Sequence, residues 1–159
     1  MSVLIFIDTA EGHVKKASLE AITYGAKVAE QLGTTAEGVV LGSVQEELSA
    51  LGKYGVKKIH HVNNENLNHL DAQVFTKVIA EVAAACGADT IIFSNNVNGK
   101  AIAPRLSARM KAGLVAGAVA LPDTSNGFVV KKNVFSGKAY ATIGVNSPVR
   151  IIALSPNAY

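Results

Sequence analysis

The sequence predicts an α/β fold, with a parallel sheet covered by helices on both faces and an antiparallel β addition toward the carboxyl end. Uninterrupted apolar runs, typical of strands buried on both faces, alternate along most of the chain with segments whose apolar residues recur at helical spacing. Hydrophobic residues make up 49% of the 159 residues and charged residues only 17%, which is typical of such a sheet. At this length we expect one domain, residues 1–159, with a core of its own.

The first strands and helices follow one another in regular order. Right-handed crossovers between such strands give a parallel sheet with helices on both faces. The predicted strands are Val3–Ile7, Ala36–Leu41, Lys58–Val62, a run that begins at Thr90 and a run that follows Gly113. The predicted helices are Lys16–Leu32, a shorter helix after Ser43 that carries Leu48 and Leu51, a helix that Asp71 caps and that runs up to Gly87, and Ala101–Ala112.

Cap and turn residues set the limits of these elements. Gly33 is a natural stop for the first helix. Asp71 is an N-cap residue for a later helix, whose buried stripe is predicted to be Val74, Val78, Ile79 and Val82. The segment Asn63–His69, just before the helix that Asp71 caps, is polar and is predicted to be a loop.

The fourth strand leads into a polar loop, Ser94–Lys100, and then into a helix. In open α/β sheets, the carboxyl end of a strand is where sites usually form. A proline deep inside a helix loses a backbone hydrogen bond, so Pro104 predicts that this helix begins near Lys100 or Ala101. Gly113 is predicted to close it.

Beyond Gly117 the helical signal disappears and the chain reads as short strands. The turns between them are predicted at PDTSNG, FSGK and NSP, which are rich in turn-forming residues. The strands themselves are predicted at Ala118–Leu121, Phe128–Lys132, Ala139–Val145 and Arg150–Leu154. We expect all four to form an antiparallel addition to the parallel sheet.

The dipeptide Gly99-Lys100 before a helix is similar to the end of a phosphate-binding loop. A Walker A loop has glycine five positions before that glycine and serine or threonine after the lysine, and here Ser94 and Ala101 stand there. The dinucleotide motif GxGxxG is also missing after the first strand, where the chain reads DTAEGH. An anion site of another kind stays open, with Asn98, Gly99 and Lys100 as weak cofactor-binding candidates. A structural turn is the favoured interpretation.

Arg105 and Arg109 are four residues apart and share one face of the predicted helix. One interpretation is a basic edge for a carboxylate, a phosphate or a partner surface. The other is two solvated arginines that pack their stems, and spacing alone favours it.

Neither a metal site nor a catalytic set is predicted. His60 and His61 are adjacent on a strand, so they point to opposite faces and do not ligate one ion together, and His13 and His69 are distant in sequence. The lone Cys86 excludes an internal disulfide and a multi-cysteine metal site, and is expected to be a buried small residue. No GxSxG or HExxH motif is present.

Composition limits the class of partner and the compartment. The net charge is +3 and the pI about 9.0, but the basic residues are scattered and aromatic residues are few, so nucleic-acid binding is not expected. No apolar run approaches the roughly 18 residues of a membrane span. A strand begins within two residues of the amino terminus, which leaves no room for a leader peptide. We expect a reducing, cytoplasmic location.

Several linked motifs resemble the amino-terminal domain of the α subunit of electron transfer flavoprotein. Family members carry G-R-D-L-A-P-R-L-A-A-R followed by a small residue, Gly and Leu; this chain has GKAIAPRLSAR at Gly99–Arg109 and AGL at Ala112–Leu114. VFSGKAYATI is similar to the family's Y-x-G-x-A segment, and SPNAY to its R-P-x-x-F. Two departures, Lys100-Ala101 for Arg-Asp and Ser155 for Arg, would weaken ion pairs that those groups make in relatives.

The resemblance implies an adenine-nucleotide α-hydrolase-like fold and a scaffold and interface role in an electron carrier. In that family an αβ heterodimer holds FAD in the α subunit and AMP in the β subunit. It passes electrons from acyl-CoA-type or other flavin dehydrogenases to a membrane-associated acceptor. Family α subunits are about twice this length, and a second domain carries most of the FAD site. The resemblance therefore implies an isolated amino-terminal domain that binds no cofactor tightly, with Arg105 and Arg109 at a partner or interdomain interface.

Two other functions stay open. The same fold and the loop Asn95–Lys100 fit a stand-alone ATP- or AMP-binding module of the universal-stress or ATP-pyrophosphatase type. Pyrophosphatase relatives carry Ser-Gly-Gly-x-Asp-Ser after the first strand, whereas Asp8–Gly12 reads DTAEG here. The third function is a structural homodimer that uses the antiparallel strands as its interface.

Overall fold

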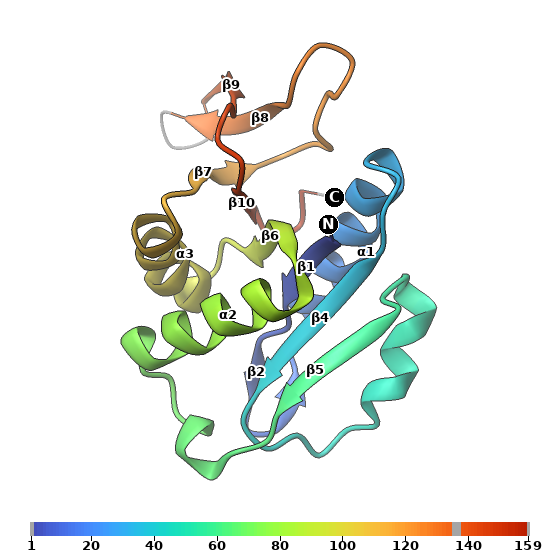
Figure 1. Cartoon of the computed structure of the whole chain (residues 1–159), viewed down its shortest axis with the longest axis vertical. Coiled ribbons are helices and arrows are strands. Elements are labelled where there is room, and N and C mark those ends of the chain that lie inside the picture. Colours follow the sequence, from blue (N-terminus) through green and yellow to red (C-terminus); the bar gives the residue numbers. More distant parts are fainter. Residues whose placement is uncertain (1, 135–137, 159) are drawn as a thin grey trace.

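The computed structural model describes residues 2–134 and 138–158, and its central feature is an eight-stranded sheet (Figure 1). The strands are β1 (Ser2–Phe6), β4 (Ala36–Leu41), β5 (Lys58–Val62), β6 (Ala88–Ser94), β7 (Gly113–Ala118), β8 (Val129–Val134), β9 (Ala139–Gly144) and β10 (Arg150–Leu154). Their order across the sheet is β5-β4-β1-β6-β10-β7-β8-β9. A separate two-stranded hairpin, β2 (Thr9–Ala10) and β3 (His13–Val14), follows β1.

Helices cover both faces of the sheet and divide the core into two parts. The helices are α1 (Lys16–Gln31), α2 (Ala72–Cys86) and α3 (Val97–Met110), with short 3-10 helices η1 (Leu48–Tyr54) and η2 (Glu65–Leu67). One core part lies under α1 and η1, and the other lies under α2 and α3, which pack side by side (Figure 1). None of the helices in the described part of the chain is long and apolar enough to cross a membrane.

The predicted fold class is confirmed. The strands β5, β4, β1, β6, β10 and β7 pair in parallel, and β8 and β9 extend the sheet in antiparallel pairing. The predicted strands at 36–41 and 58–62 have the bounds of β4 and β5. The turn predicted at FSGK falls mostly on positions 135–137, and the last residue of SPNAY is position 159; these positions lie outside the described residues.

The placement predicted for the last strand is wrong. Arg150–Leu154 does not join the antiparallel addition but lies between β6 and β7 and pairs in parallel with both. Ile151 and Ile152 point to opposite faces and are both fully buried, which requires a central position in the sheet. The strand predicted at Ala118–Leu121 does not form, because Ala118 is the last residue of β7. The Tyr24 hydroxyl donates a 2.8 Å hydrogen bond to the Ala120 carbonyl, in the segment beyond β7.

Helix α3 begins at Val97, earlier than Pro104 predicts. The Asn96 side chain accepts a hydrogen bond from the amide of Gly99 at 2.9 Å, and the Asn96 carbonyl accepts one from Lys100 at 2.8 Å. Pro104 therefore lies inside the helix, on its exposed face. This N-cap sets the start of the helix despite the hydrogen bond that the proline removes.

The carboxyl end of α3 also differs from the prediction. Lys111, with φ of 53°, takes the left-handed position at the helix end, and Gly113 is the first residue of β7. The Ser107 hydroxyl donates to the Ala112 carbonyl at 2.6 Å and holds this turn. A side-chain hydrogen bond thus supports a conformation that glycine usually supplies.

Helix α2 has the predicted cap but a different buried stripe. The Asp71 carboxylate accepts hydrogen bonds from the amides of Gln73 and Val74, which confirms its capping role. Of the predicted stripe, Ile79 is fully buried and Val78 and Val82 pack against the core, whereas Val74 is 43% exposed. The buried line runs through Phe75, Ile79 and Ala83, at the four-residue spacing of one helix face. The segment predicted as a loop at 63–69 contains η2, and the shorter helix after Ser43 is the 3-10 helix η1.

Candidate functional site

The site that parallel sheets favour lies between the carboxyl ends of β1 and β6. The chain runs from β1 outward to β4 and β5 on one side and then returns to β6 on the other side of β1. Ligands of open α/β sheets bind at such a reversal of strand order. Asp8 follows β1 at this place, and Asn96 and Asn98 follow β6.

A buried carboxylate and its donors occupy this reversal point. Asp8 is 5% exposed. The Lys15 ammonium lies 2.8 Å from its Oδ2, the Asn96 amide donates to Oδ2 at 3.2 Å, and the Asn98 amide is 3.1 Å from both carboxylate oxygens. We name these four residues the Asp8 cluster. Its donors satisfy the carboxylate and compensate its burial.

A second set of bonds fixes the backbone of Asp8 against α1. The Asp8 amide donates to Ser18 Oγ at 2.8 Å, and the Ser18 hydroxyl donates to the Asp8 carbonyl at 3.0 Å. Ser18 is fully buried in the first turn of α1. The carboxylate is therefore held from both its main chain and its side chain.

The weak cofactor-binding candidates are placed around this cluster. Asn98 donates to Asp8, the Gly99 amide donates to Asn96, and Lys100 is exposed. A negative carboxylate at the start of α3 disfavours a phosphate group there, because like charges repel. The adjoining cavity, lined by Asp8 and Asn98 among others, measures about 170 Å³. Small-molecule sites are usually at least about 300 Å³, and a second hollow of about 360 Å³ shares Thr9, Leu41 and Asn68 with this cavity.

Gly99 permits the close turn from β6 into α3. A Cβ atom at this position would lie 1.9 Å from the carbonyl oxygen of Ser94. The Ser94 hydroxyl itself is buried and has no hydrogen-bond partner among the described residues. Because a backbone atom makes the contact with Gly99, no side-chain rotation relieves it.

Arg105 and Arg109 both lie on the exposed face of α3, as the four-residue spacing predicts. Neither has a hydrogen bond or ion pair with another residue in the ranges 2–134 and 138–158. Val97, on the same helix, is 82% exposed. The exposed surface of α3 therefore presents two cations in its second half and an apolar side chain at its first residue.

The histidines of β5 point to opposite faces, as predicted. His60 Nε2 is 2.8 Å from Glu37 Oε1 of β4, whereas His61 Nε2 is 2.6 Å from the carbonyl of Gly42. Cys86, expected to be buried, is partly exposed at the end of α2. Sequence reasoning did not pair Glu37 with His60, because the partners come from different strands.

Comparison with known proteins identifies relatives over nearly the whole chain. A family model described as "Electron transfer flavoprotein domain" matches residues 3–159. "Protein FixB" of Clostridium saccharobutylicum is 29% identical over 143 residues, which is 89% of this chain and 43% of that protein. "Electron transfer flavoprotein subunit alpha" of Bacillus subtilis (strain 168) is 26% identical over 156 residues, 98% of this chain and 47% of that protein.

A protein with that same subunit name from Clostridium acetobutylicum is 30% identical over 144 residues. The match covers 89% of this chain and 43% of that protein. The chain thus spans less than half the length of these curated relatives.

Proposed function

This chain belongs to the electron transfer flavoprotein domain family, and from that premise we propose that it is the amino-terminal scaffold and interface domain of an α subunit. The observation that carries the proposal is the match of residues 3–159 to the family model, together with relatives that bear the α-subunit name. The assembled carrier would pass electrons from flavin dehydrogenases to a membrane-associated acceptor.

The chemistry of the chain supports a scaffold role. Electron transfer of this kind depends on a bound flavin, to which the protein contributes binding, orientation and electrostatics. At the reversal point of the sheet, the Asp8 cluster occupies the place where a nucleotide would bind in a related fold. We therefore propose that FAD is held mainly by a second α domain, and AMP by the β subunit, while this chain provides a rigid platform.

The partner of this platform is the β subunit of the same carrier. Arg105 and Arg109 are exposed on α3 and have no partner within the described part of the chain. Free guanidinium groups of this kind bind carboxylates well. We place the subunit or interdomain interface on this face.

Flavin content tests the proposal. We expect the purified 159-residue chain to show no stoichiometric flavin absorbance. With its own β subunit and a second α domain supplied in the same cells, we expect it to elute in one complex that contains FAD. Stoichiometric FAD on the isolated chain would contradict the proposal that a second α domain carries most of the FAD site. Failure to join the complex would contradict the scaffold role.

The same preparation separates the alternatives. Calorimetry with ATP and AMP is expected to give no binding in the micromolar range, because Asp8 occupies the reversal point. Micromolar binding would instead support a stand-alone nucleotide module. A mass measurement in solution tests the structural homodimer, which a strict monomer would exclude.

A further inference from the structure

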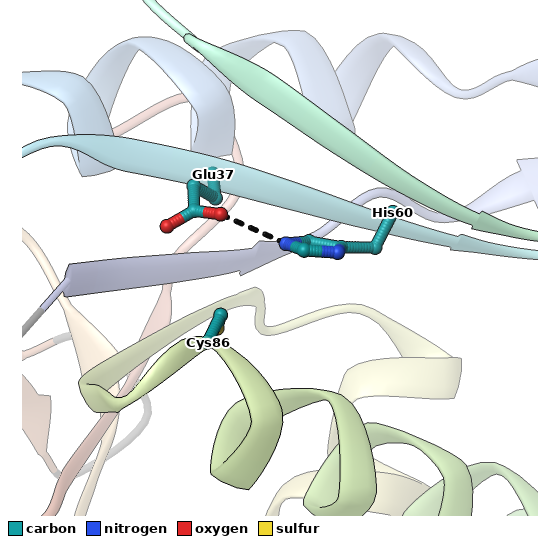
Figure 2. A group of neighbouring side chains, drawn as sticks. All are labelled: Glu37, His60 and Cys86. Atoms are coloured by element: carbon teal, nitrogen blue, oxygen red, sulfur yellow. Dashed lines mark hydrogen bonds and ion pairs between the residues drawn. The ribbon is translucent and has the colours of Figure 1, made fainter.

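Three side chains that commonly ligate metal ions meet on one face of the sheet, at the opposite end from the Asp8 cluster. Glu37 lies near the start of β4, His60 lies on β5, and Cys86 is the last residue of α2. Figure 2 shows Glu37 and His60 pointing toward one another from neighbouring strands, with Cys86 reaching the same space from the helix end. We name these residues the Glu37 triad.

Alternation along the strands explains why these three side chains share a face. Glu37 lies two positions before Val39 on β4, so both side chains point to the face under α2, where Val39 packs in the core. In the same way, His60 lies two positions before Val62 on β5, and Val62 packs against the same core part. Cys86 ends the helix that covers this face. The meeting of the three side chains is therefore fixed by the sheet and its helix, and does not depend on a loop.

The distances within the triad are close to those of a metal site. Glu37 Oε1 and His60 Nε2 are 2.8 Å apart, and the three ligand atoms all lie within 4.8 Å of one another. Ligand atoms of a tetrahedral zinc site lie about 3.3–3.6 Å apart, given Zn–O and Zn–N bonds of about 2.0–2.1 Å and a Zn–S bond of about 2.3 Å. The Glu37–His60 pair must therefore open by about 0.5 Å to admit an ion, and the longer distances must shorten by up to about 1.5 Å, a shift that side-chain rotation is large enough to supply.

The surroundings also favour a cation. The triad lies at the carboxyl end of α2, where the helix dipole is negative. The side chains of Glu37 and His60 are 16% and 22% exposed, so an ion can enter and still be partly shielded from water. The Ser2 hydroxyl lies 3.8 Å from Cys86 Sγ, where it can donate to a thiolate. One carboxylate, one imidazole and one thiolate form the mixed donor set that zinc accepts.

We propose that Glu37, His60 and Cys86 bind one Zn²⁺ ion, with the fourth position taken by water. Binding replaces the hydrogen bond between Glu37 and His60 and releases the proton of the Cys86 thiol to solvent. The ion links β4, β5 and α2, elements that are otherwise joined by core packing and strand pairing. The site shares no residue with the Asp8 cluster or with Arg105 and Arg109, so the test of zinc binding does not depend on the electron-carrier role.

Metal titration of the full 159-residue chain tests the proposal. We expect one equivalent of Zn²⁺ to bind with a micromolar or tighter dissociation constant, measured by competition with a chromophoric chelator. Co²⁺ in its place is expected to show a thiolate-to-metal charge-transfer band. The substitutions Cys86→Ser, His60→Gln and Glu37→Gln should each weaken Zn²⁺ binding at least about tenfold, and Cys86→Ser should remove the charge-transfer band.

The exposed pair of His13 and Glu46 provides a matched control. Their side chains lie 3.2 Å apart, and the metal-ligand groups found in the described part of the chain do not include them. His13→Gln is therefore expected to leave Zn²⁺ affinity unchanged. Absence of saturable binding in the micromolar range, an unchanged affinity in Cys86→Ser, or an equal loss in His13→Gln would overturn the proposal.

A second measurement needs no variant. The rate at which iodoacetamide alkylates Cys86 in the folded native chain is compared with and without one equivalent of Zn²⁺. Because the metal-bound thiolate is no longer a free nucleophile, we expect the rate to fall at least about tenfold. An unchanged rate would count against ligation by Cys86 even if the three substituted chains failed to fold.

Discussion

At the scale of single residues, Gly99 shows how a backbone contact determines residue type. The substitution Gly99→Ala places a methyl group 1.9 Å from the Ser94 carbonyl oxygen, so the start of α3 must shift. We expect the free energy of unfolding to fall by about 2 kcal/mol, within the range for overpacked sites, measured by urea denaturation. Gly52→Ala is the control, because nothing lies within 4 Å of a Cβ there. Equal stability of both variants would contradict the argument.

Asp8 is the residue whose charge organises the reversal point. Asp8→Asn preserves the shape of the side chain but leaves Lys15 and the two asparagine amides without a carboxylate. Hydrogen bonds to charged groups contribute about 1.5–3 kcal/mol, and we expect a loss of that order in urea denaturation. Glu46→Gln at the exposed His13 pair is the comparison and should change stability by less than about 1 kcal/mol. A loss at Asp8 no larger than that would contradict the structural role of the cluster.

The contacts of the Asp8 cluster could not be predicted from the sequence. The sequence predicts a polar loop at the carboxyl end of a strand, and it places Asn98 there. It does not reveal that Asn98 serves a carboxylate 90 positions earlier in the chain. From the sequence alone, an asparagine in such a loop is equally consistent with a phosphate ligand. Its actual partner, Asp8, comes into contact with it only in the folded chain.

At the scale of elements, the start of α3 depends on Asn96. This side chain caps the helix through the Gly99 amide and also donates to Asp8. Asn96→Ala is expected to cost about 1–2 kcal/mol and to speed hydrogen exchange at the Gly99 amide. Asn64→Ala removes a similar cap from η2, where the side chain accepts only from the Asn66 amide on an exposed surface. The loss there should be smaller, and a larger loss would contradict the double role of Asn96.

The bounds of some strands could be predicted from the sequence, but the partners of the last strand could not. Local patterns predict β4 and β5 to the residue, because the apolar residues of β4 and the glycine-containing turn GKYG before β5 are local signals. No local pattern determines the position of β10 in the sheet, since its partner strands lie more than thirty residues away in sequence. The consecutive isoleucines Ile151 and Ile152 carry the available signal, because burial on both faces is expected of a central parallel strand.

At the scale of the whole molecule, motifs and structure provide different kinds of information. The linked motifs from Gly99 onward indicate the family, which the match over residues 3–159 shows. They do not indicate the Glu37 triad, whose members lie 23 and 26 positions apart along the chain and outside those motifs. Tertiary structure alone brings such residues together, so a site of this kind has no signal in local spacing.

For the assembled carrier, we predict that the exposed arginines of α3 contribute to binding of the β subunit. Arg105 and Arg109 lie on the face of the sheet opposite α1, and their removal leaves both core parts intact. We expect the double substitution Arg105→Ala and Arg109→Ala to preserve the thermal midpoint of the chain. The affinity of the completed α subunit for the β subunit should fall at least tenfold, about 1.4 kcal/mol, because desolvated guanidinium groups frequently dominate interfaces.

The matched control for this prediction is Lys27→Ala, which removes an exposed cation from α1 on the other face. If the arginines act by contact, Lys27→Ala leaves the affinity unchanged while the double variant weakens it. If they act only through net charge, the two variants weaken association in proportion to the charge removed, and added salt abolishes the difference. Unchanged association of the double variant would move the interface away from α3. The family assignment, which rests on the whole of residues 3–159, would still stand.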